Sequence, residues 1–458
     1  MKLIQVIFIS VIVFSANLLQ AQDVLETIGT WDMQEDIILK CENLNQAGSD
    51  LNNDGFDDYI LAARDNYYFF MGGTDLNNTY DFMLEGPGSS GGVSWGGDLN
   101  GDGYKDIVYS RGVDWGDPGD VYICLGGEEI DMEPELILHG EDYVNDAYGL
   151  NYSGINGGYD FNGDGYDDLL TWGDGPSMSW NGLIQIFFGG DELDSEPDFQ
   201  IQGGIEEPFG RFWAICDIDG DGFDDLIASR NCDFEGPADI ELYLGGENMD
   251  TICDYVLVEE WGGDGNYFTT GDFNGDGIEE LIIRNGPNGA VGSFYFNSSD
   301  ELVFQQNYLE MPGYFRSADI NGDEYIDIIS WHLEQDIFMI YYGGPGSDYD
   351  YDILYQSENI TTSYFWSNIG DVNGDGEDEI LINNRANEDD LGNNATIYGI
   401  PGSDANEEWK IVNCKLKINS VVWDGKDEYR NIVSSGIYLY RLVDDGRVLT
   451  SQKMILMK

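Results

Sequence analysis

Seven short acidic loops recur in this chain of 458 residues. The clearest copy, DLNGDGYKD from Asp98 to Asp106, has carboxylate or amide side chains at its first, third, fifth and ninth positions and glycines at its fourth and sixth. Calcium takes six to eight oxygen ligands of this kind at about 2.3–2.6 Å, whereas zinc and copper prefer histidine or thiolate. The glycines allow the tight turn that brings the oxygens together. The pattern therefore predicts a calcium-binding loop.

The seven copies, loop 1 to loop 7 in chain order, share one predicted ligand set. Four side chains, at positions one, three, five and nine, and the backbone carbonyl at position seven would hold the ion. The predicted ligands are Asp50, Asn52, Asp54, Phe56 and Asp58 in loop 1; Asp98, Asn100, Asp102, Tyr104 and Asp106 in loop 2; Asp160, Asn162, Asp164, Tyr166 and Asp168 in loop 3; Asp217, Asp219, Asp221, Phe223 and Asp225 in loop 4; Asp272, Asn274, Asp276, Ile278 and Glu280 in loop 5; Asp319, Asn321, Asp323, Tyr325 and Asp327 in loop 6; and Asp371, Asn373, Asp375, Glu377 and Glu379 in loop 7.

Four loops differ from the common pattern at position three, six or nine. Loop 6 has Glu324 where the other copies have glycine, which predicts a strained or altered turn. Loops 5 and 7 end on glutamate, Glu280 and Glu379, whose longer side chain still reaches an ion. Loop 4 has Asp219 where the other copies have asparagine, which adds a negative charge and is expected to raise calcium affinity.

Two other loop classes and a metal-free turn fit the sequence less well. An EF-hand needs flanking helices and a bidentate glutamate at position twelve, whereas these loops end at position nine. Dockerin-like pairs are also helical and come in twos. A solvated acidic turn without metal explains one copy but not seven in register. Calcium, up to seven ions with a structural role, is the predicted cofactor.

The segments around the loops have the composition of β-strands. Each loop follows a short apolar or aromatic stretch such as RFWAIC and precedes a branched apolar run such as DLIAS. In five of the repeats a third stretch then ends near Gly-Gly, as in YYFFMGG, and a fourth stretch such as PELILHG comes before the next repeat. The loops begin 48, 62, 57, 55, 47 and 52 residues apart, a period typical of propeller blades.

The repeats predict an all-β fold, a seven-bladed propeller of four-stranded antiparallel blades over residues 22–404. Ring closure would remove exposed sheet edges. The last repeat lacks a fourth strand before residue 404, and a matching stretch lies near Val24 to Thr30. This N-terminal stretch is expected to complete the last blade. The acidic loops and Gly-Gly turns would share one face of the ring, and the remaining loops the other.

The two ends of the chain differ from the middle. Lys2 is followed by an apolar run and by Ala21, which predicts a secretory signal peptide over residues 1–21. Residues 405–458 hold nine of the 19 basic side chains against seven acidic ones and form a separate, small, β-rich module. The six cysteines show no framework spacing; Cys232 with Cys253 is the best candidate pair, and buried free thiols are the alternative.

The charge of the chain limits its partners. With 88 acidic and 19 basic residues the formal net charge is -69, so a phosphate backbone would be repelled and no nucleic acid is expected as a partner. Bound divalent cations would offset part of the self-repulsion. No segment after the signal peptide is apolar enough to cross a bilayer, so no integral membrane protein is expected.

Residues 22–404 resemble FG-GAP repeats, the blades of the integrin α-chain propeller, in loop pattern and spacing. The name-giving pair is present as Phe209 and Gly210. The resemblance implies that calcium is structural and stiffens a hairpin on the face away from the ligand. It also implies a secreted or cell-surface module for adhesion or for binding an extracellular glycan or protein.

The last 38 residues, from Val421, resemble the end of C-terminal sorting domains recognised by the type IX secretion system, which have an immunoglobulin-like sandwich. Trp423 to Gly425 and Ser435 to Tyr438 contribute most to this match. The module here is shorter than in that family, so it is a partial one. The resemblance implies the secretion machinery as a partner and passage across the outer membrane of a Gram-negative bacterium.

Scarce cations suggest where a ligand would bind. Of nine basic residues between 22 and 404, five stand where the strand after an acidic loop is expected to end, and the other two repeats have tryptophan there; the set is Arg64, Arg111, Trp172, Arg230, Arg284, Trp331 with its neighbour His332, and Arg385. Arginine and tryptophan together suit an acidic sugar or a carboxylate-bearing peptide. Alternatively, each arginine pairs with an aspartate of its own or a neighbouring blade.

Signals for catalysis are few. The chain has two histidines, His139 and His332, and none of the nucleophile, zinc-protease or phosphate-loop motifs. We therefore expect a binding module rather than an enzyme. A polysaccharide lyase or glycoside hydrolase on the same propeller is the alternative, because acidic pairs are abundant.

Overall fold

The computed structural model divides the chain into two compact units, Val24–Asn406 and Met1–Asp23 together with Glu407–Lys458. It describes residues 5–7, 19–20, 26–33, 48–62, 66–74, 76, 80–85, 92–111, 120–127, 130, 132–139, 154–173, 182–204, 209–230, 238–261, 267–285, 290–296, 302–310, 314–332, 337–347, 352–356, 366–387, 390–399, 436–444 and 447–456.

The smaller unit contains a β-hairpin near the C-terminus. β30 (Gly436–Asp444) and β31 (Arg447–Leu456) pair antiparallel, and β1 (Gln5–Ile7) pairs parallel with β30. β2 (Leu19–Gln20) has two residues. Two strands of the expected β-rich module are therefore present, whereas the stretch around Trp423 lies outside the described residues.

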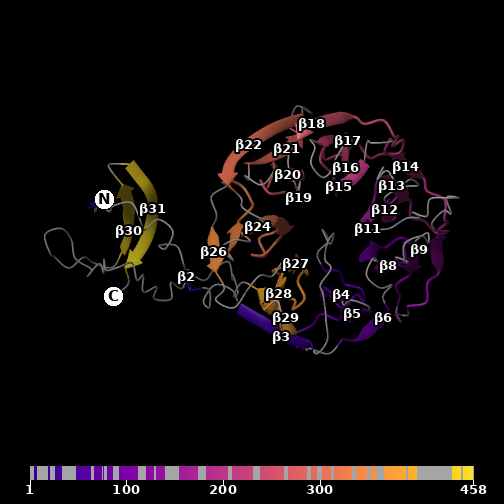
Figure 1. Cartoon of the computed structure of the whole chain (residues 1–458), viewed down its shortest axis with the longest axis horizontal. Helices are drawn as coiled ribbons and strands as arrows, with labels where there is room; N and C mark the ends of the chain where they lie inside the picture. The colour runs from indigo at the N-terminus through magenta and orange to yellow at the C-terminus, as the bar shows by residue number, and fades with distance from the viewer. Residues whose placement is uncertain are drawn as a thin grey trace. The chain divides into compact units, whose positions relative to one another are not determined.

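The larger unit is a ring of antiparallel sheets, numbered here by the acidic loop that each contains (Figure 1). From the centre outwards, the strands are β4 (Tyr59–Ala62), β5 (Asn66–Phe70) and β6 (Phe82–Glu85) in sheet 1; β7 (Val93–Gly97), β8 (Asp106–Arg111), β9 (Asp120–Cys124) and β10 (Leu136–His139) in sheet 2; β11 (Gly154–Tyr159), β12 (Asp168–Gly173), β13 (Leu183–Phe187) and β14 (Phe199–Gln202) in sheet 3; and β15 (Phe209–Cys216), β16 (Asp225–Arg230), β17 (Ala238–Tyr243) and β18 (Tyr255–Trp261) in sheet 4.

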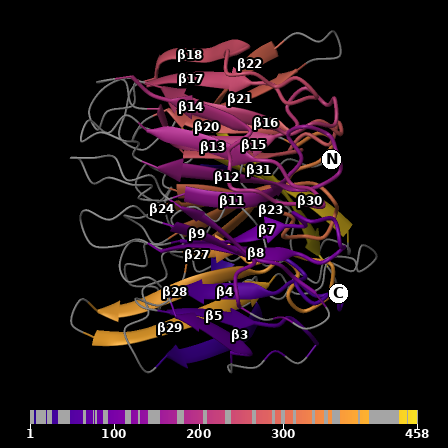
Figure 2. The same cartoon turned by 90° about the vertical axis from the view of Figure 1, so that its right-hand side faces the viewer.

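The remaining three sheets continue the ring in the same order. They consist of β19 (Tyr267–Gly271), β20 (Glu280–Asn285), β21 (Ala290–Phe296) and β22 (Leu302–Glu310) in sheet 5; β23 (Tyr314–Ala318), β24 (Asp327–His332), β25 (Ile337–Tyr341) and β26 (Ile353–Gln356) in sheet 6; and β27 (Trp366–Asn368), β28 (Ile380–Asn387), β29 (Asp390–Gly399) and β3 (Glu26–Met33) in sheet 7. Seen from the side, the strands of successive sheets lie stacked above one another (Figure 2).

The expected all-β propeller of four-stranded antiparallel blades is confirmed, but the expected count of seven such blades is wrong. Six of the described sheets have at least four strands, and sheet 1 has three. In sheet 1 only an isolated bridge, Ser49 to Asp58, stands where the other sheets have their innermost strand.

The sheets follow from the pattern of apolar residues. In β12 the successive residues Leu169, Leu170 and Thr171 are buried, so both faces of this strand are covered by neighbouring sheets. In the outermost strand β14, buried Phe199 and Ile201 alternate with exposed Gln200 and Gln202. This alternation places one side of the outer strand against the neighbouring blade and the other in water.

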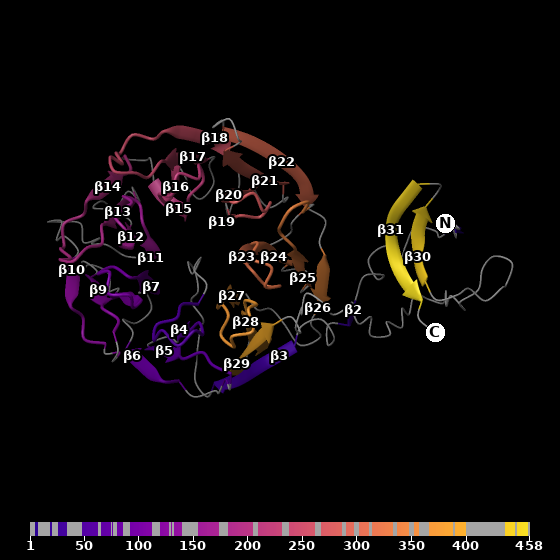
Figure 3. The ribbon, with the colours of Figure 1, turned by 180° about the vertical axis from the view of Figure 1, so that it is seen from behind.

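The N-terminal strand completes the last sheet, as the sequence predicts. β3 pairs antiparallel with β29, from Met33 opposite Asn393 to Glu26 opposite Gly399. A cluster with Tyr59 and Phe70 of sheet 1 and Leu381 of sheet 7 lies across the junction of the first and last repeats. The ring thus closes by a sheet that the two ends of the larger unit share (Figure 3) and by the apolar packing of this cluster.

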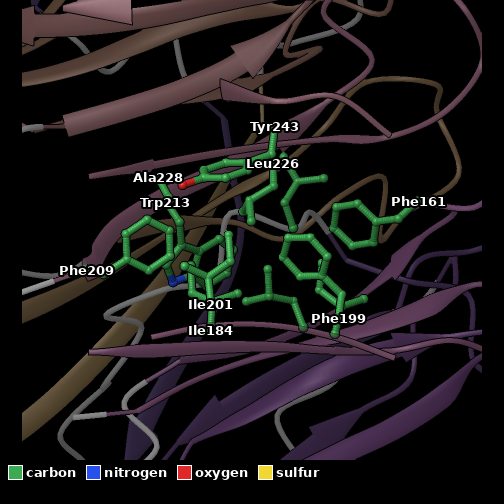
Figure 4. Close-up of a cluster of buried hydrophobic side chains, with 12 residues drawn as sticks. Phe161, Ile184, Phe199, Ile201, Phe209, Trp213, Leu226, Ala228 and Tyr243 are labelled. Carbon is green, nitrogen blue, oxygen red and sulfur yellow. The ribbon is translucent and has the colours of Figure 1, made fainter. Parts of the chain in front are cut away.

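The hydrophobic core lies between neighbouring sheets. Between sheets 3 and 4 a cluster joins Phe161 and Ile184 to Phe209, Trp213 and others (Figure 4). Further clusters join sheets 1 and 2, 2 and 3, 4 and 5, and 5 and 6. Each sheet therefore stabilises its neighbours, which fixes the positions of the acidic loops relative to one another.

Two smaller expectations concern the cysteines and the membrane. Cys253 is a half-buried free thiol, which contradicts the expected pairing with Cys232, a residue outside the described part of the chain. The alternative of a buried free thiol holds for Cys216. No helix in the described part of the chain has the length and apolarity needed to cross a membrane.

Candidate metal centres

The first aspartate organises each acidic loop. In loop 2 the backbone N–H of Asp102 donates to Asp98 Oδ1 at 3.0 Å, and that of Gly103 donates to Asp98 Oδ2 at 2.9 Å. The same pair of bonds is present in the other six loops. These bonds curl the loop around its first carboxylate and direct the oxygens at positions one, three and five to one side.

Hydrogen bonds between residues two positions apart hold the side chains at positions three and five. The backbone N–H of Asp102 also donates to Asn100 Oδ1 at 3.0 Å, and that of Tyr104 donates to Asp102 Oδ1 at 2.9 Å. All seven loops have the bond to the fifth side chain. The turn itself needs positive φ, which Gly101 and Gly103 supply at 71° and 89°.

The side chain at position nine connects the loop to the rest of its sheet by hydrogen bonds. Asp106 is buried and accepts bonds from the backbone N–H of Leu99 at 2.8 Å and of Gly126 at 2.7 Å. Gly126 belongs to the Gly-Gly turn between the third and fourth strands, and the equivalent bonds recur in loops 1, 3, 4 and 6. The predicted placement of the acidic loops and the Gly-Gly turns on one face of the ring is therefore confirmed.

Two loops gather three carboxylates each. In loop 4 one oxygen from each of Asp217, Asp219 and Asp221 lies within 4.8 Å of the others, as do those of Asp272, Asp276 and Glu280 in loop 5. In every loop except loop 4 asparagine stands at position three, so amide and carboxylate oxygens share the site. An all-oxygen donor set on a tight loop fits a hard cation such as calcium.

Burial raises the pKa of the ninth carboxyl in every loop. Because the side chain lies inside the ring and close to the carboxylates of positions one and five, its charged form is disfavoured. The pKa rises to about 7 for Asp58, Asp106, Asp168 and Glu280, to about 8 for Asp225 and Asp327, and to about 9 for Glu379. A bound dication would favour the ionised forms and release protons on binding.

The altered turn of loop 6 keeps the common geometry. Glu324 takes φ 71°, and its N–H donates to Asp319 Oδ2 at 2.8 Å as the glycine does in the other loops. The expectation of strain is confirmed, because a side chain at this φ is disfavoured. The expectation of an altered bond pattern is not met.

A cavity of about 380 Å³ lies at the centre of the ring on this side. Its walls come from the inner strands of sheets 3 to 7 and include the carboxylates of Asp224, Glu279 and Asp378. These acids stand at position eight of their loops. No role was expected for this position, although the Asp-Asp endings of loops 1, 3 and 4 are a visible signal in the sequence.

The residues expected to ring the opposite mouth do not share one strand position. Counted from the ninth loop residue, Trp172 and Trp331 come four residues later, whereas Arg111 and Arg230 come five residues later. Side chains alternate along a strand, so these two sets point to opposite faces of their sheets. Arg64 lies outside the described residues, as do the side chains of Arg111, Arg284, His332 and Arg385.

Arg230 is engaged within its own sheet. Its Nε donates to both carboxylate oxygens of Glu241, at 2.7 and 2.8 Å, and its guanidinium lies 4.6 Å from the centre of the Phe209 ring. A third bond runs from Arg230 to the hydroxyl of Tyr243 at 3.0 Å. The alternative interpretation, an arginine paired inside the blade, therefore describes Arg230.

The two tryptophans are also packed into the ring. Trp331 is 1% exposed and stacks on Phe338 at 5.5 Å between ring centres, so it presents no face to a ligand in this structure. Trp172 donates from Nε1 to the carbonyl of Phe209 at 3.1 Å, between sheets 3 and 4. A continuous ring of arginine and tryptophan on one surface is thus not formed by the described side chains.

Comparisons with known proteins give a weak link to one group. No family model matches the chain. Integrin alpha-5 of Xenopus laevis is 28% identical over 204 residues, which covers 40% of this chain and 19% of the integrin. The chain thus spans about a fifth of that relative. This alignment and the arrangement of sheets support an FG-GAP-like propeller.

A solved structure corrects the expectation about catalysis. The crystal structure of a rhamnogalacturonan lyase aligns with 83% of this chain and 91% of its own, at a TM-score of 0.34 and 13% identity. The expectation that this chain is not an enzyme is contradicted by this comparison and is withdrawn. A likeness this low assigns no substrate, reaction or catalytic residue to the chain.

Proposed function

We propose that this chain is an extracellular propeller that uses calcium as a structural element and binds a glycan or a protein ligand on the face opposite its acidic loops. The observation that carries the proposal is the common geometry of the seven loops, each with its first carboxylate wrapped by the same two N–H groups. Calcium bound there would neutralise converging carboxylates and stiffen the connection between the first two strands.

The fold assignment extends to a seventh blade. Sheet 1 contains an acidic loop with the same bonds as the others, and the bridge between Ser49 and Asp58 continues it inwards. We count it as a blade whose innermost described part is this bridge. All seven candidate calcium sites then lie on one closed ring.

The ligand face is inferred from geometry and likeness together. The loops opposite the acidic face follow β8, β20 and β28, where Arg111, Arg284 and Arg385 stand on the strands. The weak likeness to an integrin α chain favours adhesion or extracellular binding, but only a fifth of that protein is spanned. Arg230 is excluded as a ligand residue because Glu241 already pairs with it.

Export is part of the proposal. Residues 1–21 would direct secretion, and residues 405–458 would be recognised by the secretion machinery that their resemblance implies. The high negative charge suits an extracellular role in which calcium is abundant.

One screen tests the proposal. The full chain is presented to arrays of extracellular glycans and proteins with calcium and with a chelator, and each hit is assayed for turnover as well as binding. We expect calcium-dependent binding that Arg111→Ala weakens and that Glu192→Ala, a change at an exposed acid, leaves unchanged. Release of product from a polysaccharide would reassign the same face to a lyase or hydrolase. If the screen finds neither binding nor turnover, the proposal is refuted.

A further inference from the structure

Five of the seven loops have an acid at position eight, and its carboxylate contacts the loop of the preceding sheet. In sheet 4, Asp224 Oδ2 accepts a bond of 2.7 Å from the backbone N–H of Asp160, the first residue of loop 3. In return, the N–H of Asp224 donates to the carbonyl of Asp160 at 3.1 Å. Both polar groups of the Asp160 backbone are thus held by one residue of the next blade.

The same contact recurs around the ring. Asp167 accepts from Asp98 at 2.6 Å, Glu279 from Asp217 at 3.2 Å, Asp378 from Asp319 at 3.0 Å, and Asp57 from Asp371 at 3.0 Å. In every case the acceptor belongs to the blade after the loop that it holds. The direction around the ring is therefore constant.

Two junctions lack the side-chain contact. Position eight is Lys105 in loop 2 and Ile326 in loop 6, and neither offers an acceptor to the preceding loop. Lys105 instead donates to Asp167 at 3.1 Å. Ile326 keeps the backbone bond to the carbonyl of Asp272, at 3.3 Å. The ring is thus divided into two linked series, loops 2 to 5 and loops 6, 7 and 1.

Side-chain packing follows the same route. A Cβ at Gly101 in loop 2 would overlap the ring of Tyr166, the seventh residue of loop 3, and one at Gly163 would overlap Phe223 of loop 4. At the closing junction, Phe56 lies against Gly374 in the same way. Each of these turns is therefore shaped by the residue that follows it around the ring.

We propose that the position-eight carboxylate is a positioning residue for the calcium site of the preceding blade. The first aspartate supplies a predicted calcium ligand. In loops 2, 3, 6 and 7 the next blade holds both its N–H and its carbonyl, and in loop 4 it holds the N–H. Losing this support would leave the ligand free to turn away from the ion. Outer partners that orient a metal ligand typically account for about 10–100-fold in metal affinity. The inference rests on the proposed calcium role.

Hydrogen exchange of the loop peptides, read by mass spectrometry at increasing free calcium, tests the proposal in the full chain. In Asp224→Ala we expect the calcium concentration that half-protects loop 3 to rise about 10-fold or more. The half-protecting concentration for loop 4, which contains the mutated residue, should change less than about twofold. A general loss of stability would instead shift both loops together, and that result would count against the inference.

Two further variants keep the test decisive if Asp224→Ala folds poorly. Asp224→Asn retains an oxygen acceptor, so calcium protection of loop 3 should largely return. Ile326→Asp supplies the missing acceptor opposite Asp272 and should lower the half-protecting concentration for loop 5, while the neutral swap Ile326→Val should not. The inference would be overturned, with the calcium role intact, if calcium protects the wild-type loops but the half-protecting concentration stays unchanged for loop 3 in the Asp224 variants and for loop 5 in Ile326→Asp. If calcium leaves hydrogen exchange of the wild-type loops unchanged, the proposed calcium role is overturned as well.

Discussion

The carboxylate of Asp57 accepts a hydrogen bond of 3.0 Å from the backbone N–H of Asp371, and the N–H of Asp57 donates to the carbonyl of Asp371 at 3.0 Å. These residues are 314 positions apart and belong to the first and last acidic loops. Their two bonds close the ring on the loop face, the pairing of β3 with β29 closes it at the outer edge of sheet 7, and the Tyr59 cluster closes it between sheets 7 and 1. Elements that are far apart in the sequence therefore close the ring together.

Asp57→Ala should weaken this closure. It removes an acceptor from a part-buried N–H, which typically costs about 1–3 kcal/mol of unfolding free energy. Urea unfolding followed by tryptophan fluorescence measures the loss, with Glu192→Ala as the exposed control. A variant as stable as the control would mean that the junction is held by apolar packing alone.

The repeat could be read from the sequence because each blade uses the same local rules. An acidic loop with two glycines, apolar strands on either side and a Gly-Gly turn define the strand order, and the unpaired stretch near Thr30 predicts the shared sheet. That sheet 1 has three strands and an isolated bridge among the described residues was not predictable in this way, because the loop pattern does not determine which backbone segments pair.

The opposite face was harder to predict, because residue type does not fix strand register. Arg230 and Trp331 both occur near the end of a second strand, but they differ by one position and so face different sides. The sequence also gives no sign that Glu241 lies opposite Ala228, from where its carboxylate meets Arg230. The roles of the position-eight acids depend on contacts between blades, which a single repeat does not contain.

The ion pair of Arg230 and Glu241 should be structural. The side chains are only 24% and 10% exposed, so removing one partner leaves a poorly solvated charge. We expect Glu241→Ala to cost about 3 kcal/mol of unfolding free energy. The double variant with Arg230→Met should recover part of this loss, because it removes the stranded charge. Chemical unfolding of both variants measures the difference, and a double variant no more stable than Glu241→Ala would contradict this account.

Glu324→Gly should stabilise the protein. Glu324 takes φ 71°, a region where a side chain costs about 1–2 kcal/mol, and glycine occupies the equivalent place in the other loops. Part of the gain is lost to the greater freedom of glycine in the unfolded chain, which leaves about 1 kcal/mol or less. In the reverse change, Gly103→Glu, the new Cβ would meet no atom within 4 Å, but the side chain would have to take φ 89°. This variant should therefore be destabilised by a similar amount. Thermal unfolding of both variants measures the two effects, and a change in melting temperature of the same sign in both would contradict the prediction.

Calcium and pH should act on the same carboxyls. In the calcium-free fold, burial raises the pKa of Asp58, Asp106 and Asp168 from 3.8 to about 7, so the folded state holds more protons than the unfolded state between these values. Stability without calcium should therefore be greatest on the acid side of this window and fall as the pH rises through it. Calcium favours the ionised forms and opposes this fall.

The difference in melting temperature between calcium and chelator should thus widen from about pH 5 to about pH 8. Differential scanning calorimetry over this range, with magnesium as the control ion, measures it. Magnesium should stabilise less, because its smaller octahedral shell suits a flexible loop of six to eight oxygens poorly. A calcium effect that is constant with pH would mean that the ninth carboxyls do not bind the ion, and equal effects of the two ions would mean that the loops only screen charge.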